Sequence, residues 1–191
     1  MIHADFEASA REVVENYWRI RAALKLMQPI IKNDTQPLRF EGIPQVGCMS
    51  GLLRTETISE AHTSLGAYAA HRLSRDMFLA LIAAFERRLI NWLTTAGQGS
   101  SGTLGFLQNT VQKTTSLPSD LIEDLDEVRE RRNALMHHDG LADDKYVAAS
   151  IKVHSRTPSH IPIVVIGTPI VPDGRYLTYA ADVLARYSAA I

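Results

Sequence analysis

The spacing of apolar residues along the chain predicts helices over most of its length. Near the N-terminus, apolar side chains recur at steps of three and four, the period of a helix with one buried face: Phe6, Ala10, Val13, Tyr17, Leu24 and Met27. We expect this helix to end near Pro29. A second stripe predicts one long central helix from about Ser59 to Ala96; it is formed by Phe78, Leu81, Phe85, Leu89 and Trp92.

Two connecting segments are rich in glycine. Residues 39–55 hold three glycines and a proline without a clear period, so we expect an irregular loop over about 34–58. With Arg39 and Arg54 at its ends, this loop could close over a cleft or contact a partner. The segment GQGSSG at 97–102 follows a helix and not a strand, so it is a linker and not a dinucleotide-binding turn.

The second half of the chain predicts four more helical segments and a hairpin. Helices are expected over about Leu104 to Lys113, from about Leu121 onward with Ser116 or Ser119 as its cap, and over about 173–190 with Asp173 as its cap. A short helical segment, DDKYVAA, is expected after Gly140. SIKVH and IPIVVIG are expected to pair as a β-hairpin within about 150–171. The predicted fold is mostly α: a single domain, 1–191, built as an up-and-down bundle of four to five helices with a small β-hairpin appendage.

Composition narrows the class of protein. Hydrophobic residues make up 46% of the chain and charged residues 21%, which is typical of a soluble globular domain. The formal charge of −1 argues against a protein that coats nucleic acid. Cys48 is the only cysteine, so an intrachain disulfide and a cysteine-rich metal site are excluded. We expect a cytoplasmic protein without a signal peptide, a membrane span, a bound metal or a cofactor.

The segment RRNALMHHDG, residues 131–140, places charge where an apolar residue is expected. On a helical wheel, Arg132 lies within the apolar stripe formed by Leu121, Leu125, Val128 and Leu135. A buried guanidinium destabilises the fold unless it is paired. Two interpretations follow: a structural salt bridge to an acid such as Glu86, or an arginine that waits in a cleft or subunit interface for an anionic ligand.

The neighbouring side chains suggest the chemistry. Asn133 and His137 are four residues apart and share a face, so the amide can orient the imidazole. Arg132 and His137 are five apart and point roughly 140° away from each other. They meet within one chain only if the helix ends early or the arginine curls round, whereas two facing helices in a dimer would bring them together. An early helix end could also present His138 in place of His137.

RNALMH resembles the R-x4-H signature of the HEPN superfamily, the higher eukaryotes and prokaryotes nucleotide-binding domains. The continuation HHDGLADDKYV and the final helix PDGRYLTYAADVLARY are also similar to stand-alone bacterial members, over about residues 55–191. The resemblance implies a metal-independent endoribonuclease that leaves a 2',3'-cyclic phosphate at a site built from two chains. It assigns Arg132, Asn133 and His137 as catalytic residues, with His138 and Glu86 as additional candidates.

The partners implied by the resemblance are an RNA substrate, a second copy of the chain, and an antitoxin or defence-system protein. The chemistry suits the residues, because histidine titrates near neutrality and arginine offers a forked donor to phosphate. Between Ser119 and Tyr146, however, the sequence contains nine acidic and four basic residues. This excess of negative charge is unfavourable for RNA binding. The alternative is a noncatalytic HEPN-like module that binds nucleotide, RNA or a protein partner.

Overall fold

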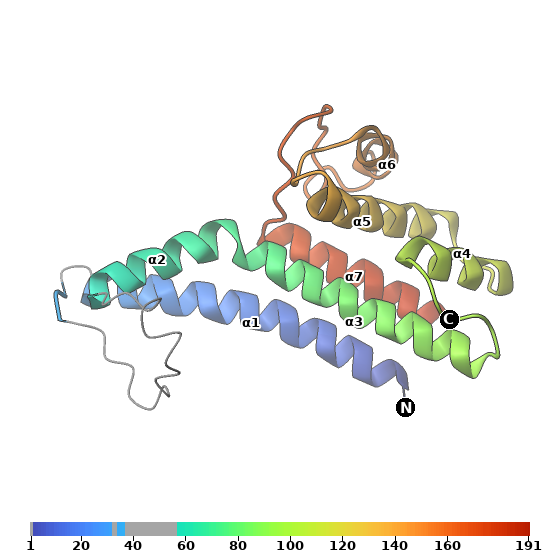
Figure 1. Ribbon diagram of the computed structural model, residues 1–191, viewed down its shortest axis with the longest axis horizontal. Coiled ribbons are helices and arrows are strands. Elements are labelled where there is room, and N and C mark those ends of the chain that lie inside the picture. The colour runs from blue at the N-terminus through green and yellow to red at the C-terminus, as the bar shows by residue number, and fades with distance from the viewer. Residues whose placement is uncertain (1, 32–33, 37–56) are drawn as a thin grey trace, which may run out of the picture. The chain divides into compact units, whose positions relative to one another are not determined.

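A computed structural model of the chain describes residues 2–31, 34–36 and 57–191, and these residues form seven helices (Figure 1). The helices are α1 (Ile2–Ile31), α2 (Ile58–His71), α3 (Leu73–Thr95), α4 (Leu104–Thr114), α5 (Ser119–His137), α6 (Asp144–His154) and α7 (Gly174–Ala190). The mostly α class is therefore confirmed. The loop expected over about 34–58, with Arg39 and Arg54, lies almost entirely outside the described residues.

The chain divides into two compact units, and the first boundary falls within α1. The larger unit comprises Met1–Tyr17 and Ser74–Ile191, and the smaller unit comprises Trp18–Leu73. In the larger unit, Phe85 of α3 lies at the centre of an aromatic core, 5.7 Å from Phe6 of α1 and 5.7 Å from Tyr187 of α7, measured between ring centroids. Burial of each such side chain contributes about 1.5–3 kcal/mol.

The smaller unit is a helical hairpin made of the second half of α1 and all of α2. Ile58 and Ser59 at the start of α2 donate backbone hydrogen bonds to the carbonyl oxygens of Gln36 and Asp34. A capping box begins α2: the Glu60 amide donates to the Thr57 hydroxyl at 3.2 Å, and the Thr57 amide donates to the Glu60 carboxylate at 2.8 Å. These bonds fix where the second helix starts.

The single central helix predicted from Ser59 to Ala96 is wrong. The chain leaves helical geometry at Arg72, with φ −120° and ψ −36°, which separates α2 from α3. No glycine or proline stands at the break to mark it in the sequence. The pattern that predicted one helix could not reveal this interruption.

The hairpin predicted over about 150–171 is also wrong, and no strand forms in the described residues. SIKVH belongs to α6, which buries Tyr146, Ala149, Ser150 and Val153 at helical spacing. The Asp143 carboxylate caps α6 by accepting from the Tyr146 amide at 2.8 Å, which starts a helix that runs through the expected strand. The returning segment instead joins the turn after α5 through an isolated bridge between Leu141 and Pro169.

The C-terminal helix agrees with the prediction. Asp173 caps α7 by accepting from the Tyr176 amide at 2.8 Å. α4 likewise covers the predicted segment. Among the helices in the described part of the chain, none combines the length and the apolar character that crossing a bilayer would need.

Candidate functional site

A buried ion pair fixes the helix that carries the RNALMH segment. α5 packs against α6 and α7 within the larger unit. On α5, the Nε of Arg131 donates to Oε1 of Glu127 at 3.1 Å, and the two side chains are only 4% and 0% exposed. The pair therefore lies inside the protein.

Two tyrosines complete this buried network. Arg131 donates to the hydroxyl of Tyr146 on α6, and its guanidinium carbon lies 3.6 Å from the ring centroid of Tyr176 on α7. Tyr176 donates its hydroxyl to Oε2 of Glu127 at 2.9 Å. Burial is the largest single influence on the pKa of Arg131 and would lower it, but the combined interactions with Glu127, Tyr176 and Tyr146 raise that pKa. The network joins three helices and sets the rotation of α5.

Arg132 lies elsewhere than the helical wheel predicted. The buried arc of α5 extends through Glu127, Arg131 and Ala134, which leaves Arg132 at its edge with a side chain that is 26% exposed. The buried guanidinium that needs a partner is therefore that of Arg131, one residue earlier. The wheel missed this because it counted only apolar residues, whereas Arg131 and Glu127 are buried by neutralising each other.

The C-terminal end of α5 lines an open hollow of about 310 Å³ in the larger unit. Its walls come from the start of α4, the end of α5, and the segment that begins α6. The lining residues are Thr103, Leu104, Gly105, Arg129, Glu130, Arg132, Asn133, His137, His138, Asp143 and Lys145. Arg132, Asn133, His137 and His138 thus meet at one surface of a single chain.

Arg132 is held loosely by its neighbours. Its Nη2 lies 3.7 Å from Oε1 of Glu86 on α3, and its Nη1 donates to Oδ1 of Asn133 at 3.3 Å. Both distances exceed those of strong charge-assisted bonds, and Glu86 does not line the hollow. Asn133 in turn donates its Nδ2 to Glu130 at 3.1 Å. A guanidinium in this setting can turn toward an anion without leaving a buried carboxylate stranded.

The two histidines stand in different environments. α5 ends at His137, so the helix end that would let Arg132 and His137 share a surface is present. His137 is exposed. His138 follows as the cap residue, and its Nε2 lies 3.4 Å from Oδ2 of Asp143. A carboxylate beside an imidazole favours one ring orientation, which makes His138 the better oriented of the two.

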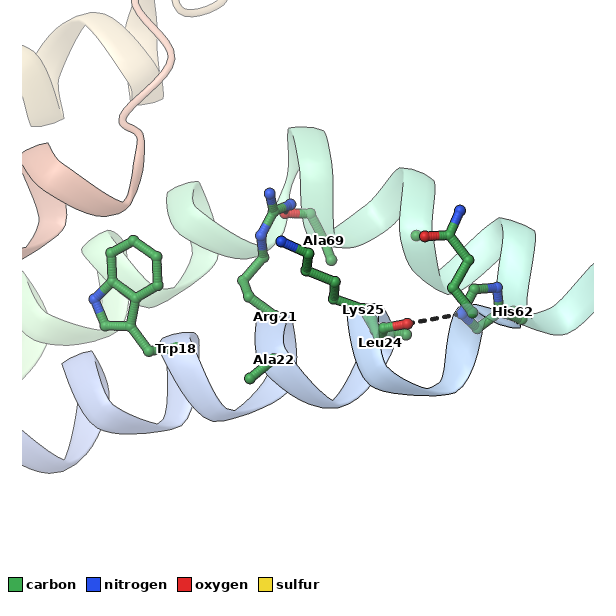
Figure 2. A pocket seen from close by; sticks show the side chains of 9 residues that line it. Trp18, Arg21, Ala22, Leu24, Lys25, His62 and Ala69 are labelled. Carbon is green, nitrogen blue, oxygen red and sulfur yellow. Dashed lines mark hydrogen bonds between the residues drawn. The ribbon is translucent and has the colours of Figure 1, made fainter. Parts of the chain in front are cut away.

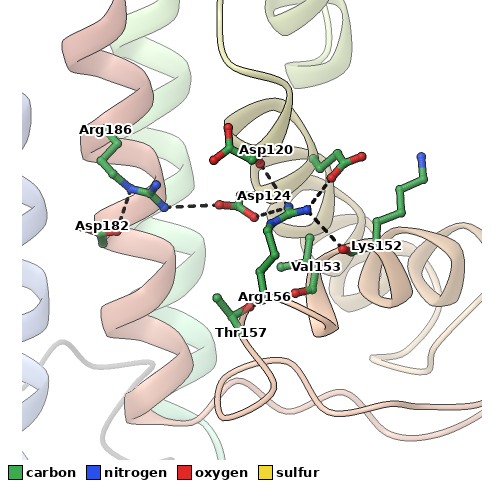
Figure 3. Close-up of polar contacts among 9 residues, drawn as sticks. Asp120, Asp124, Lys152, Val153, Arg156, Thr157, Asp182 and Arg186 are labelled. Carbon is green, nitrogen blue, oxygen red and sulfur yellow. Dashed lines mark hydrogen bonds and ion pairs between the residues drawn. The ribbon is translucent and has the colours of Figure 1, made fainter.

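Most acids of this region do not line the hollow. Of the nine between Ser119 and Tyr146, only Glu130 and Asp143 line it, against three cations: Arg129, Arg132 and Lys145. Glu127 is committed to Arg131, as described above. Asp124 and Glu123 pair with Arg156 at 2.8 Å and 2.6 Å, and Asp124 also pairs with Arg186 (Figure 3). The acidic count along the sequence therefore overstates the negative charge at the site.

Several lining residues escaped the sequence analysis. Thr103 and Gly105 bring the start of α4 to the hollow, and helix starts favour anions. Lys145 adds positive charge, whereas Arg129 is already paired with Asp126 at 2.9 Å and with Glu130 at 2.8 Å. Asp143 adds a carboxylate that caps α6 and faces His138. Of these, Asp143 and Thr103 carry a sequence signal, as capping residues before DKYVAA and LGFLQN. Within the described ranges, no cluster of three or more histidines, cysteines or acids is placed to hold a metal ion.

Comparison with protein-family models, with curated proteins and with solved structures finds no match to this chain. The resemblance to HEPN domains therefore stays a prediction based on the motif and its flanks.

Proposed function

We propose that this protein is a metal-independent endoribonuclease of the HEPN type, with its reaction centre at the end of α5. The observation that carries the proposal is that Arg132, Asn133, His137 and His138 line one open hollow. Their chemistry is that of a phosphate-binding cation, an amide that bonds this cation, and two imidazoles that can accept or donate a proton.

The proposed reaction uses only the RNA and these side chains. A histidine accepts the proton of a ribose 2'-hydroxyl, whose oxygen then bonds to the adjacent phosphorus. The bond from phosphorus to the 5'-oxygen breaks, that oxygen takes up a proton, and the product ends in a 2',3'-cyclic phosphate. Arg132 stabilises the negative charge that accumulates on the phosphorane oxygens. We assign His137 as the base, with His138 as the alternative.

The proposed function includes a homodimer, because the resemblance to HEPN domains implies one. Because Arg132 and His137 line the same hollow in one chain, their spacing alone no longer requires a second copy. Sedimentation at micromolar concentration should nevertheless show a dimer if the active unit is composite. A strictly monomeric protein that still cleaves RNA would contradict the composite site.

A role in toxin-antitoxin or antiphage defence, with a cognate inhibitor protein, rests on the resemblance alone. If it holds, expression of the wild-type chain should arrest growth, and expression of Arg132→Ala should not. Equal toxicity of the two chains would remove RNA cleavage as the cause.

One observation favours the alternative of a noncatalytic binding module. The contact of 3.7 Å between Arg132 and Glu86 is the pair expected if the arginine has a structural role. That role would leave the hollow free to bind nucleotide, RNA or a protein without cleaving anything.

Incubation of purified protein with labelled single-stranded RNA in excess EDTA tests the two functions against each other. The nuclease account predicts cleavage by the wild type and a loss of about 10² to 10⁴ in rate for Arg132→Ala. Lys152→Ala, an exposed change on α6 outside the hollow, is the matched control and should cleave normally. RNA binding without cleavage would instead support the binding module.

A further inference from the structure

The smaller unit contains a second hollow, of about 590 Å³, between the second half of α1 and α2 (Figure 2). Its lining includes Trp18, Arg21, Lys25 and Gln28 from α1, and His62 and Gly66 from α2. All these residues belong to the one compact unit. Nothing in the proposed cleavage reaction uses them.

The charge that lines this hollow is positive. Arg21 and Lys25 are four residues apart on α1 and lie side by side in Figure 2. No aspartate or glutamate is among the described lining residues. Like charges at this spacing repel each other. An anion bound between the two side chains would remove that repulsion.

Both cations keep donors for a ligand. Arg21 donates its Nη1 to the carbonyl oxygen of Ala69 at 3.0 Å, which holds the guanidinium at the hollow. Among the described residues, its other N–H groups have no partner. Within the described part of the chain, the Lys25 ammonium has no ion pair.

The described acids of the smaller unit bond other groups. Its described residues include only Asp34 and Glu60 as acids. Glu60 accepts from Thr57 in the capping box, and Asp34 accepts from the Gln36 amide at 2.9 Å. Residues 18–31 of α1 carry three bases and no acid. The charges of Arg21 and Lys25 therefore have no neutralising acid within the second half of α1.

An aromatic surface and open space accompany the charge. Trp18 lines one end of the hollow and is 48% exposed. At Gly66, an added Cβ would meet no atom within 4 Å. Cations that track a backbone, together with an aromatic ring on which bases stack, are the combination by which proteins bind single-stranded nucleic acid. An acidic peptide would satisfy the cations but would make no particular use of the ring.

We propose that this hollow binds single-stranded RNA, with Arg21 and Lys25 contacting phosphates and Trp18 stacking on a base. The choice of RNA over DNA rests on the proposed function, since the reaction needs a 2'-hydroxyl. In this account the larger unit cleaves the RNA and the smaller unit supplies much of the affinity.

Fluorescence anisotropy with a short, labelled, uridine-rich RNA tests the site. The measurement uses the full chain with His137→Ala and His138→Ala, so that the probe stays intact. Lys25→Glu should weaken binding roughly tenfold at low salt, and the slope of log Kd against log salt should fall by about 0.7 for each phosphate that the variant no longer neutralises. Lys152→Glu makes the same charge change on exposed α6 and should bind normally.

A second variant tests the hollow without altering charge. Gly66→Met fills open space on α2, so it should weaken RNA binding while the helix content stays at the level of the parent chain. Normal RNA binding by both Lys25→Glu and Gly66→Met would overturn the inference. A glutamate-rich peptide is the competing probe: tighter binding of the peptide than of RNA, abolished in Gly66→Met, would assign the hollow to an acidic protein partner and also overturn it.

The outcomes separate this inference from the proposed function. RNA binding that depends on Lys25, together with no cleavage by the wild type, would support the inference and contradict the nuclease. Cleavage by the wild type, together with unchanged binding in both variants, would do the reverse.

Discussion

Arg131 and Glu127 form an ion pair of 3.1 Å one turn apart on α5, with both side chains almost fully buried. Arg11 and Glu7 form a pair of the same spacing on α1, at 3.0 Å, with both side chains exposed. The two pairs differ in burial and in their partners, and so provide a matched comparison.

Arg131→Met should lower the free energy of unfolding by about 3–5 kcal/mol, because it leaves the Glu127 carboxylate buried without its cation. Arg11→Met should change it by less than about 1 kcal/mol, because water solvates Glu7. Urea unfolding of both variants measures the difference. Equal losses would mean that the buried network does not fix α5.

Release of Arg132 from Glu86 distinguishes a structural arginine from a functional one. Both side chains are partly exposed and 3.7 Å apart, so Glu86→Gln should change the free energy of unfolding by no more than about 1 kcal/mol. Because it frees the guanidinium for phosphate, the variant should bind RNA more tightly than the wild type. A large loss of stability with unchanged RNA affinity would instead favour the noncatalytic module.

Asp143→Asn separates the two histidines. Asparagine caps a helix as well as aspartate does, so α6 should keep its start. The change removes the charge 3.4 Å from the His138 ring. If His137 is the base, as we assign it, the cleavage rate of this variant should equal that of the wild type. A loss comparable to that of His138→Ala would transfer the role to His138.

The capping box of α2 should make stability depend on pH. The bond from the Thr57 amide lowers the pKa of Glu60 below its usual 4.5. A carboxyl group with a lowered folded pKa contributes stability above its unfolded pKa and loses it as pH falls through the folded pKa. The stability difference between wild type and Glu60→Gln should therefore shrink as pH falls below about 4.5. A difference that does not change with pH would show that the charge of Glu60 has no part in the cap.

The sequence predicted a helix correctly where a long apolar stripe follows a recognisable N-cap. α7 after Asp173 is such a case. It failed at SIKVH, where two apolar residues fit a strand and a helix equally well and only the cap at Asp143 decides. It also failed at Arg72, where the break has no local signal.

The site residues also differ in how far the sequence could predict them. Arg132, Asn133 and His137 could be selected because they lie close together in one motif. Lys145, Thr103 and Gly105 reach the hollow from other helices, and only packing brings them there. Arg131 could not be distinguished from Arg132, because the sequence does not show that Tyr146 and Tyr176 surround one arginine and not the other.

The chemical end left on cleaved RNA tests the central claim most directly. Wild-type protein, incubated with a defined RNA in excess EDTA, should yield fragments that mass spectrometry identifies as ending in a 2',3'-cyclic phosphate. His137→Ala, which removes an exposed side chain and should fold normally, should yield none at matched time. Intact RNA after incubation with the wild type, or equal cleavage by the wild type and by a variant lacking both His137 and His138, would contradict the nuclease account.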